Sequence, residues 1–323
     1  MPPRSEYGTL TISPKRPPQG ASEGAMVEGP QAAFGVIGGS GFTAMPGLAD
    51  ARAFDLDTPF GAPSSAVTVG SLGGRQVAFI ARHGEGHTTL PEEIPARANV
   101  YALKALGVTR ILSVSAVGSL REDMHPMDAV VPDQVIDRTT GRASTFFGDG
   151  AVAHVGFADP FCPSVAGALA DAVEVAGVAV HRGGTLVVIN GPAFSTRAES
   201  HLYRQWGADI IGMTALPEAK LAREAECCYA SLCFVTDYDV WREGEDDVSA
   251  DLVMQRLTAN VARGREAVAG AIASLGDRPR ACGCGDALGS ALMTSRDRVP
   301  SATRQRLGVI VRRYWSDSVG GAA

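Results

Sequence analysis

The amino-acid sequence predicts an α/β protein: a single domain with a central mixed β-sheet flanked by helices. Two observations carry this prediction. Between residues 33 and 275, short runs of β-branched and other apolar residues alternate with longer stretches of helical pattern, the order expected of strands layered against helices. The short runs also lack the polar alternation of half-exposed strands, so they suit strands buried on both faces of a largely parallel or mixed sheet.

The predicted strands are the short apolar runs. In chain order they are Phe34–Ile37, Val77–Ala81, Arg110–Ala116, Leu186–Asn190, Ile210–Met213 and Ala230–Val235.

Helical patterns fill the intervals between these runs. They cover Ala96–Leu106, Ser164–Ala176, Thr196–Trp206 and Glu218–Glu226. A longer helix is predicted from Val248 to about Leu275, because its apolar residues recur on one face. Ser249 or Asp247 is placed to cap its start.

The two ends of the chain differ from the single domain predicted for residues 34–277. Residues 1–33 contain scattered proline and glycine and no apolar segment of the secretory type, so we expect a flexible tail on a cytoplasmic protein. Residues 278–323 form an arginine-rich extension, with short helices predicted near Asp286–Thr294 and Ser301–Arg313. We expect this extension to pack against the body of the protein or a neighbouring subunit.

Composition narrows the classes of partner. The 323 residues are 45% hydrophobic and 20% charged, with a net charge of −6, the proportions of a globular protein with a sizeable core. An acidic balance has the wrong sign for binding nucleic-acid phosphates, and no run reaches the roughly 18 apolar residues of a membrane span. We therefore expect neither nucleic acid nor membrane as a partner. Only three of the basic residues are lysines, so anion binding would fall mainly to arginine, histidine and backbone amides.

The six cysteines do not form a disulfide framework. Four of them stand in apolar surroundings, where a buried thiol acts as a small hydrophobic group; these are Cys162, Cys227, Cys228 and Cys233. Cys282 and Cys284 are a close pair in a glycine-rich turn and could ligate a metal or form a strained disulfide. Two ligands without a second pair are a weak zinc signal, so no metal site is predicted.

Three turns suited to anions follow predicted strands. The first is Gly35–Gly41, where glycines let successive amides point at an anion and Ser40 adds a hydroxyl. The second is Arg82–Gly84, with an arginine fork beside His83, and the third is Ser113–Ser119. Each alone is an ordinary strand connection or a surface ion pair. Together they indicate a ligand site, because ligands of open α/β sheets bind outside the carboxyl ends of the strands.

Two carboxylates follow the last predicted strand, in the segment Thr236–Asp239. Asp237 and Asp239 could bind a metal or a polar ring edge, or one of them could act as an acid; an acidic loop that caps the next helix is the alternative. A metal would need more ligands than the scattered histidines offer. No nucleophilic triad emerges, since the sequence has no G-x-S-x-G turn.

Ordered blocks from about Phe34 to Leu275 match one known family. They are VIGGSG (Val36–Gly41), ARHGEGHTTLP (Ala81–Pro91), the Ala98–Asn99 region, SAVGSLRE (Ser115–Glu122), DQVIDRTTGR (Asp133–Arg142), DPFCP (Asp159–Pro163), NGPAFSTRAES (Asn190–Ser200), GADIIGMTALPEAKLARE (Gly207–Glu224) and TDYDVW (Thr236–Trp241). On these blocks the chain resembles the trimeric purine nucleoside phosphorylase superfamily, and within it the group that cleaves S-methyl-5′-thioadenosine. The resemblance implies that inorganic phosphate cleaves a purine nucleoside to free base and a ribose 1-phosphate. It also implies a homo-oligomer, a trimer or a hexamer, with no metal or other cofactor beyond the phosphate co-substrate.

The resemblance also assigns roles residue by residue. The residues expected to hold phosphate are Ser40, Arg82, His83, Ser115, the Ala116 amide and Thr214. Phe194 would stack on the purine, Met213 would lie against the ribose, and Ser195 stands at a position linked to substrate choice. Asp237 and Asp239 would face the base edge, with Asp237 protonated in a desolvated pocket so that it can donate to N7 of the leaving purine.

Substrate choice rests on the two ends of the nucleoside. The Asp239 carboxylate suits the 6-amino group of adenine better than a 6-oxo group, which would face it acceptor to acceptor. Apolar residues at the start of the long helix match the segment that faces the methylthio group in the family, unless they are ordinary core; they are Val248, Ala250, Val253 and Met254. Methylthioadenosine is the expected substrate. Gly212, in place of the asparagine usual in that group, keeps 6-oxopurine substrates such as methylthioinosine open, and a non-catalytic nucleoside-binding protein is the alternative of another class.

Overall fold

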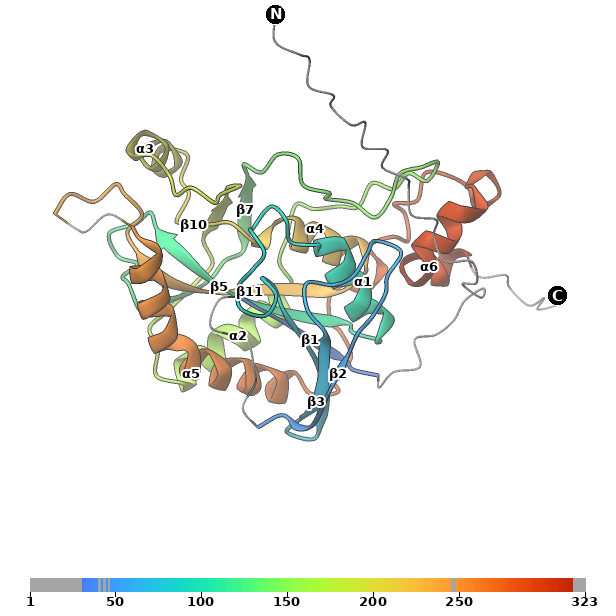
Figure 1. Cartoon of the computed structure of the whole chain (residues 1–323), viewed down its shortest axis with the longest axis horizontal. Helices are drawn as coiled ribbons and strands as arrows, with labels where there is room; N and C mark the ends of the chain where they lie inside the picture. Colours follow the sequence, from blue (N-terminus) through green and yellow to red (C-terminus); the bar gives the residue numbers. More distant parts are fainter. Residues whose placement is uncertain (1–30, 40–41, 43–44, 46, 245–247, 316–323) are drawn as a thin grey trace, which may run out of the picture.

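One branched β-sheet organises the fold (Figure 1). The computed structural model describes residues 31–315 except 40–41, 43–44, 46 and 245–247. Its strands are β1 (Phe34–Gly38), β2 (Ala49–Phe54), β3 (Val67–Leu72), β4 (Arg75–Ala81), β5 (Arg110–Ser119), β6 (Ala129–Val131), β7 (Gln134–Asp137), β8 (Val180–Arg182), β9 (Thr185–Val188), β10 (Ile210–Gly212) and β11 (Cys228–Asp237). The main path runs β2-β3-β4-β1-β5-β10-β9-β7, and a branch at β5 carries β11, β6 and β8.

The centre of the sheet is parallel. Strand β1 pairs in parallel with both β4 and β5, and β5 pairs in parallel with β11. Strand β10 is antiparallel to β5, which makes the sheet mixed. Because β1, β4, β5 and β11 point the same way, their carboxyl ends meet at one edge, and this arrangement gathers the turns that follow them.

Helices cover both faces of this centre. They are α1 (Ala96–Ala105), α2 (Pro163–Val175), α3 (Arg197–Gln205), α4 (Ala215–Glu224), α5 (Ala250–Leu275) and α6 (Ser301–Trp315). Helices α2 and α5 pack against each other on one side, while α1 contacts α4 and α6 on the other (Figure 1). Strand β11 shows the alternation that this layering requires: Tyr229 and Val235 join the core cluster with α1 and α4, whereas Leu232 joins the cluster with α2 and α5.

The predicted α/β fold is confirmed, and all but one of the predicted elements match observed ones within a few residues. Ser249 caps α5 as expected, because its hydroxyl accepts from the Leu252 amide; Asp247 lies outside the described residues. The helix predicted near Asp286–Thr294 is wrong. A short 3-10 helix, η1 (Gly283–Asp286), and turns occupy this stretch, because its backbone pairs instead with the segment around Ala153.

Strands β2, β3, β6, β7 and β8 were not predicted. Strand β2 is exposed along most of its length, so it carries no buried apolar run, and β6 and β8 have three residues each. Their signal is too short or too polar for a pattern that rests on burial.

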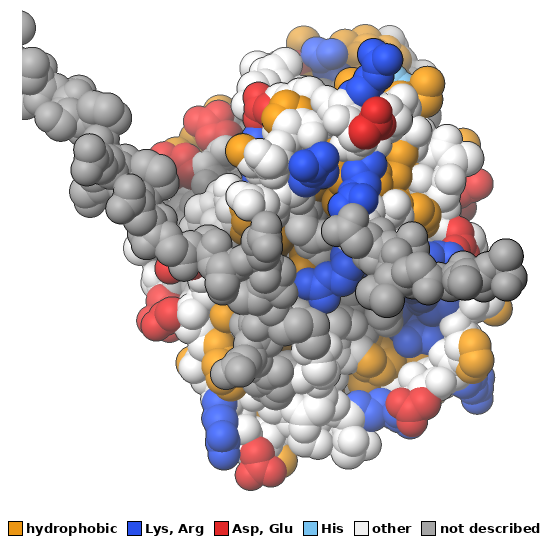
Figure 2. All heavy atoms as spheres, turned by 90° about the vertical axis from the view of Figure 1, so that its right-hand side faces the viewer, with side chains coloured by type: hydrophobic (Ala, Val, Ile, Leu, Met, Phe, Trp, Pro, Cys, Tyr) orange, Lys and Arg blue, Asp and Glu red, His pale blue; other side chains and the backbone are white. Residues whose placement is uncertain are grey.

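The carboxyl-terminal extension packs onto the body. Leu288, Leu307 and Ile310 are buried in the same core cluster as α1. Arg313 pairs with Asp286 at 2.7 Å within the extension, and Arg306 pairs with Asp149 of the body. Figure 2 views the face that carries α6, on which Lys and Arg side chains are exposed beside acidic ones. Most of the predicted tail, residues 1–30, lies outside the described residues. None of the described helices is long and apolar enough to cross a membrane.

Candidate active site

A cavity of about 310 Å³ opens at the carboxyl ends of β1, β4, β5 and β11. Its walls are formed by Gly39, Arg82, His83, His87, Pro91, Ser115, Ala116, Val117, Gly118, Ile189, Phe194, Ser195, Ile211, Gly212, Met213, Thr214, Thr236, Asp237, Asp239, Val248, Ala250, Val253 and Met254. Every described residue that the sequence analysis placed in a site is on this wall. Ser40 lies outside the described residues.

Arg82 follows β4 and is held rigidly in the wall of the cavity. Its side chain is 1% exposed, and its Nε donates to Glu218 Oε1 at 2.6 Å. Its Nη2 donates to Ser113 Oγ at 2.6 Å, and its Nη1 donates to the Val114 carbonyl at 2.8 Å. Burial alone would lower the pKa of Arg82, but the Glu218 carboxylate outweighs burial and raises it. The guanidinium is therefore a fixed cation with a fixed orientation.

Glu218 is a functional residue that the motif search missed. It lies on α4, is 1% exposed, and also accepts a hydrogen bond from the Tyr229 hydroxyl at 3.0 Å. Its only sequence signal was its place inside the block Gly207–Glu224. Glu218 does not itself line the cavity but orients Arg82, which does, and sequence spacing alone does not reveal this.

His83 is neutral and has a defined tautomer. Its Nδ1 lies 2.9 Å from the carbonyl oxygen of Thr89, which only accepts, so Nδ1 carries the proton and Nε2 is an acceptor. Burial, together with the neighbouring Arg82 cation, lowers the pKa of His83 to about 4, against the opposing hydrogen bond to Thr89. The ring stacks on His87 with centroids 4.3 Å apart.

The small residues near Arg82 allow close approach to the backbone. Ser115 and Ala116 belong to β5, and Thr214 immediately precedes α4. A Cβ at Gly39 would stand 3.0 Å from Arg82 Nη1 and from the Val114 carbonyl. A larger residue at Gly39 would therefore crowd the donors, which gives a physical reason for the glycine turn.

Asp237 ends β11, also lines the cavity and is 4% exposed. Thr236 Oγ donates to its Oδ2 at 2.7 Å, and the Asp239 amide donates to its Oδ1 at 2.8 Å. Burial raises the pKa of Asp237 from 3.8 to about 6; the two donors oppose the rise and the Asp239 carboxylate adds to it. A carboxyl group with such a pKa can donate a proton near neutral pH.

Gly118 on β5 makes room for that carboxyl group. A Cβ at Gly118 would stand 2.8 Å from Asp237 Oδ1 and 3.0 Å from Ile211 Cγ2. Real side chains do not approach so closely, so the position requires glycine. Gly118 is a second residue whose role the sequence did not show.

Asp239 carries a buried oxygen that lacks a donor. Its backbone has φ +50°, a left-handed conformation, and its side chain is 6% exposed. Among the described residues, Asp239 Oδ2 and Ser195 Oγ are buried without a hydrogen-bond partner. Burial raises the pKa of Asp239; the hydroxyls of Ser200 and Ser195 lie near enough to offset part of the rise but do not meet hydrogen-bond geometry with Oδ2. Such an oxygen is costly unless a ligand supplies a donor.

The rest of the wall is apolar. Met213 directly follows β10, and Phe194 is 41% exposed. Val248, Val253 and Met254 line the wall at and before the first turn of α5, and Met254 is 42% exposed. The buried core face of α5 begins at Leu257, one turn later. The interpretation of these residues as ordinary core is therefore wrong.

A parallel α/β core with anion donors, a carboxylate pair and an apolar wall in one cavity defines a small-molecule enzyme site. The model of the Phosphorylase superfamily matches residues 33–273, and the chain belongs to this family.

The similar proteins match 80–90% of this chain and 98–100% of their own length. The S-methyl-5′-thioadenosine phosphorylase of Koribacter versatilis is 50% identical over 90% of this chain and 100% of its own. A methylthioadenosine phosphorylase from an antarctic soil metagenomic library is 49% identical, with a TM-score of 0.83 over 87% of this chain and 99% of its own. The Schistosoma mansoni methylthioadenosine phosphorylase in complex with adenine is 37% identical, with a TM-score of 0.76 over 80% of this chain and 98% of its own.

Proposed function

We propose that this protein cleaves S-methyl-5′-thioadenosine with inorganic phosphate to give adenine and 5-methylthioribose 1-phosphate. The observation that carries the proposal is the order of groups around one cavity. Anion donors, a carboxyl group with a raised pKa, and apolar side chains from α5 line the same space. The names of the similar proteins point to the same substrate.

Phosphate would bind beside Arg82. Nη1 carries two N–H groups and the Val114 carbonyl takes one, so the other is open to an anion within the described part of the chain. His83 Nε2, an acceptor in the neutral ring, suits the hydroxyl of monohydrogen phosphate. Ser115, the Ala116 amide and Thr214 would add donors, and Ser40 would do so by family resemblance.

The purine would bind between Phe194 and the two carboxyl groups. Asp239 Oδ2 lacks a donor, and the 6-amino group of adenine supplies one. A 6-oxo group would leave the same oxygen facing an acceptor, a mismatch worth about 1–3 kcal/mol. Ser195 stands beside Asp239 with its own unpartnered hydroxyl, and this position suits the adjacent edge of the ring.

The sugar and its 5′ substituent would face the remaining wall. Met213 would lie against the ribose, and Val248, Ala250, Val253 and Met254 would surround the thiomethyl group. A thiomethyl group gains by leaving water for apolar surroundings, whereas a 5′-hydroxyl would lose its hydration there.

The chemical step would rest on positioning and electrostatics. A phosphate oxygen forms a bond to C1′ as the C1′–N9 bond breaks, and the electron pair of that bond goes to the purine. Asp237 donates a proton to N7, and the proton lost by monohydrogen phosphate restores the balance. Fixed donors around the phosphate hold the dianion under a ribose that becomes cationic, a gain from orientation and preorganised charge.

Adenine release tests the proposal. Purified protein should release adenine from methylthioadenosine only when phosphate is added, and should act more slowly on adenosine and on methylthioinosine. Release without phosphate would indicate a hydrolase, and binding without any release would indicate a non-catalytic protein. Faster reaction of methylthioinosine would favour the 6-oxopurine alternative that Gly212 keeps open. Each of these three outcomes would overturn the proposal.

The oligomeric state, the domain boundaries and the cellular compartment are also proposals. We infer a homo-oligomer, a trimer or a hexamer, supported by the exposed apolar rim at Phe194 and Met254, which a neighbouring chain would cover. Sedimentation analysis of the full chain tests it, and a monomer at assay concentration would contradict it. We place the catalytic domain at residues 34–277, with residues 278–323 as its support, in the cytoplasm, a setting that agrees with the free cysteines of the described residues.

A further inference from the structure

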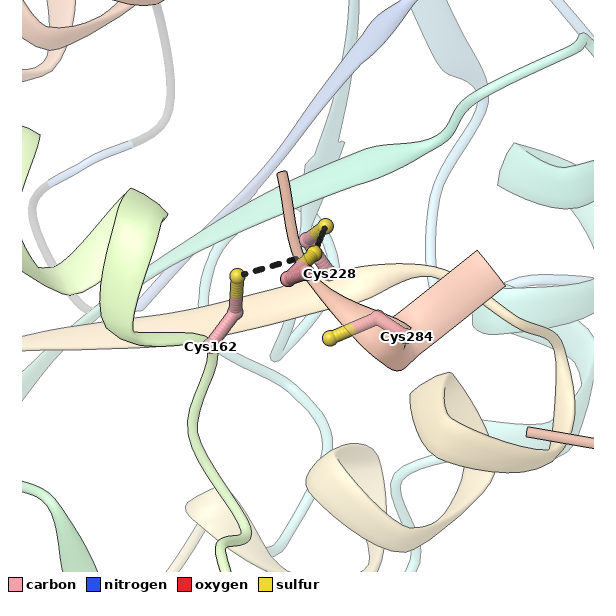
Figure 3. A group of neighbouring side chains, drawn as sticks. Cys162, Cys228 and Cys284 are labelled. Carbon is pink, nitrogen blue, oxygen red and sulfur yellow. Dashed lines mark hydrogen bonds between the residues drawn. The ribbon is translucent and has the colours of Figure 1, made fainter. Parts of the chain in front are cut away.

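Four thiols from three distant segments meet on the far side of the sheet from the helix α1 cluster. Cys162 is the residue before α2, Cys228 begins β11, and Cys282 and Cys284 stand on either side of Gly283 where η1 starts. Their Sγ atoms all lie within 4.8 Å of one another. Figure 3 shows Cys162, Cys228 and Cys284 approaching one point from separate segments.

The spacing fits a tetrahedral metal site better than disulfides. Four sulfurs about 2.3 Å from a zinc ion would be about 3.8 Å apart. The Sγ atom of Cys282 lies 3.7 Å from that of Cys162 and 3.4 Å from that of Cys228. A disulfide needs about 2.05 Å, and all four cysteines are free.

The start of α2 also favours a metal-bound thiolate. Cys162 immediately precedes the first turn of α2, where the partial positive charge of the helix end stabilises a thiolate. A divalent cation would balance the negative charge of four cysteine ligands, because zinc binding deprotonates them.

We propose that Cys162, Cys228, Cys282 and Cys284 bind one zinc ion in a closed structural site. Four protein ligands leave no open position for substrate, which is the pattern of structural rather than catalytic zinc. None of the four cysteines lines the active-site cavity. The sequence predicted no metal because only the Cys282–Cys284 pair was recognised; the fold supplies the second pair.

The ion would fasten the extension to the catalytic body at the point where the extension begins. Two ligands belong to the body and two to the extension. The nearby links are single hydrogen bonds: Arg280 donates to the Glu226 carbonyl at 2.6 Å, and the Leu288 amide donates to Glu226 Oε1 at 3.0 Å. A zinc ion would join the same two parts through four metal–sulfur bonds.

Metal analysis of the full chain tests the proposal. Protein expressed with zinc, purified without chelator and dialysed should contain about one zinc per chain by elemental analysis. Cys284→Ser and Cys162→Ser should each reduce the content at least fivefold. Cys227→Ser is the matched control, because Cys227 is equally buried but bonds to the Val108 carbonyl outside the cluster; it should keep its zinc. Wild-type protein without zinc, or variants that keep it, would overturn the proposal.

Thiol counting and cobalt exchange make the outcome decisive even if a variant fails to fold. Wild-type protein denatured with chelator and without reductant should titrate six thiols, whereas a count of four or two would show disulfides instead. Cobalt replacing zinc should give the intense thiolate-to-metal absorption of a tetrahedral site. Six free thiols with neither zinc nor cobalt bound would overturn the proposal as well.

Discussion

Replacing Asp237 by asparagine should make the protein more stable at neutral pH and much less active. The folded protein keeps the Asp237 proton up to about pH 6, whereas the ordinary pKa of an aspartic acid side chain is 3.8. The stability that this group contributes is full below pH 3.8 and is lost as the pH rises through 6. The difference between a pKa of 3.8 and one of about 6 corresponds to about 3 kcal/mol. Asparagine does not ionise, so the variant does not lose this stability as the pH rises.

The hydrogen bonds around Asp237 permit the substitution. An asparagine Oδ1 can still accept from the Asp239 amide. Thr236 Oγ lies 3.2 Å from the Val117 carbonyl, so it can donate there and accept from the asparagine amide instead. The variant should therefore unfold several degrees higher than wild type at pH 7.5, and the difference should disappear near pH 4. Activity should fall about 10²–10⁴-fold, the usual contribution of a general acid.

Thermal unfolding at both pH values, at one protein concentration, measures the first effect, and phosphate-dependent adenine release measures the second. The pH profile adds a third readout: wild-type kcat/KM should decline above about pH 6 as Asp237 ionises, and the variant should lack this decline. Asp239→Asn is the matched control for the profile, since it should keep the decline. An Asp237→Asn variant that is less stable at pH 7.5, or that keeps wild-type turnover, would refute the assigned role.

Other substitutions test the remaining parts of the cavity. Glu218→Gln leaves a buried Arg82 cation unpaired and its orientation less fixed, so it should lower Tm by several degrees and make the Tm gain from added phosphate smaller than in wild type; an unchanged or larger gain would contradict the orienting role, and Glu224→Gln, on the same helix, is the control. Gly118→Ala should lower kcat about 10- to 100-fold, because its Cβ would stand 2.8 Å from Asp237 Oδ1; an unchanged kcat would show that the carboxyl position is not critical. Val253→Thr should lower the preference for methylthioadenosine over adenosine about tenfold while the KM for phosphate stays the same; an unchanged preference would place the 5′ group elsewhere.

The fold could be predicted from the sequence where burial leaves a continuous signal. Strand β11 is buried at every position and helix α5 repeats its apolar face over many turns, and both stood out in the sequence. Strand β2 gave no such signal because it is exposed. The stretch after η1 has apolar residues at helical spacing, but its backbone hydrogen bonds go to the segment near Ala153. Only tertiary pairing decides whether such a stretch forms a helix or pairs its backbone with a distant segment.

The candidate site could likewise be predicted only where a residue has a local signal in the sequence. Arg82 and Asp237 could be predicted from the sequence, because each is a chemically active residue type that stands at the end of a predicted strand. The roles of Glu218 and Gly118 could not be predicted. Each acts through another side chain, Arg82 or Asp237, and depends on how close that side chain lies in the folded protein. The thiol cluster needed the fold for the same reason: 54 residues separate Cys228 from Cys282 along the chain, yet their sulfurs lie 3.4 Å apart.

Strand β11 connects the two sites. Cys228 begins it and Asp237 ends it, and at about 3.3 Å per residue the strand holds these ends roughly 30 Å apart. The parallel register with β5 fixes the strand between them, so the geometry of Asp237 depends on β5 and Gly118 rather than on the thiols. A zinc ion at the amino end would therefore stabilise the extension without changing the chemistry at the carboxyl end. Loss of the metal should lower Tm while the KM for methylthioadenosine and the pH profile stay unchanged, whereas a change in that profile would show that the two ends of the strand are coupled.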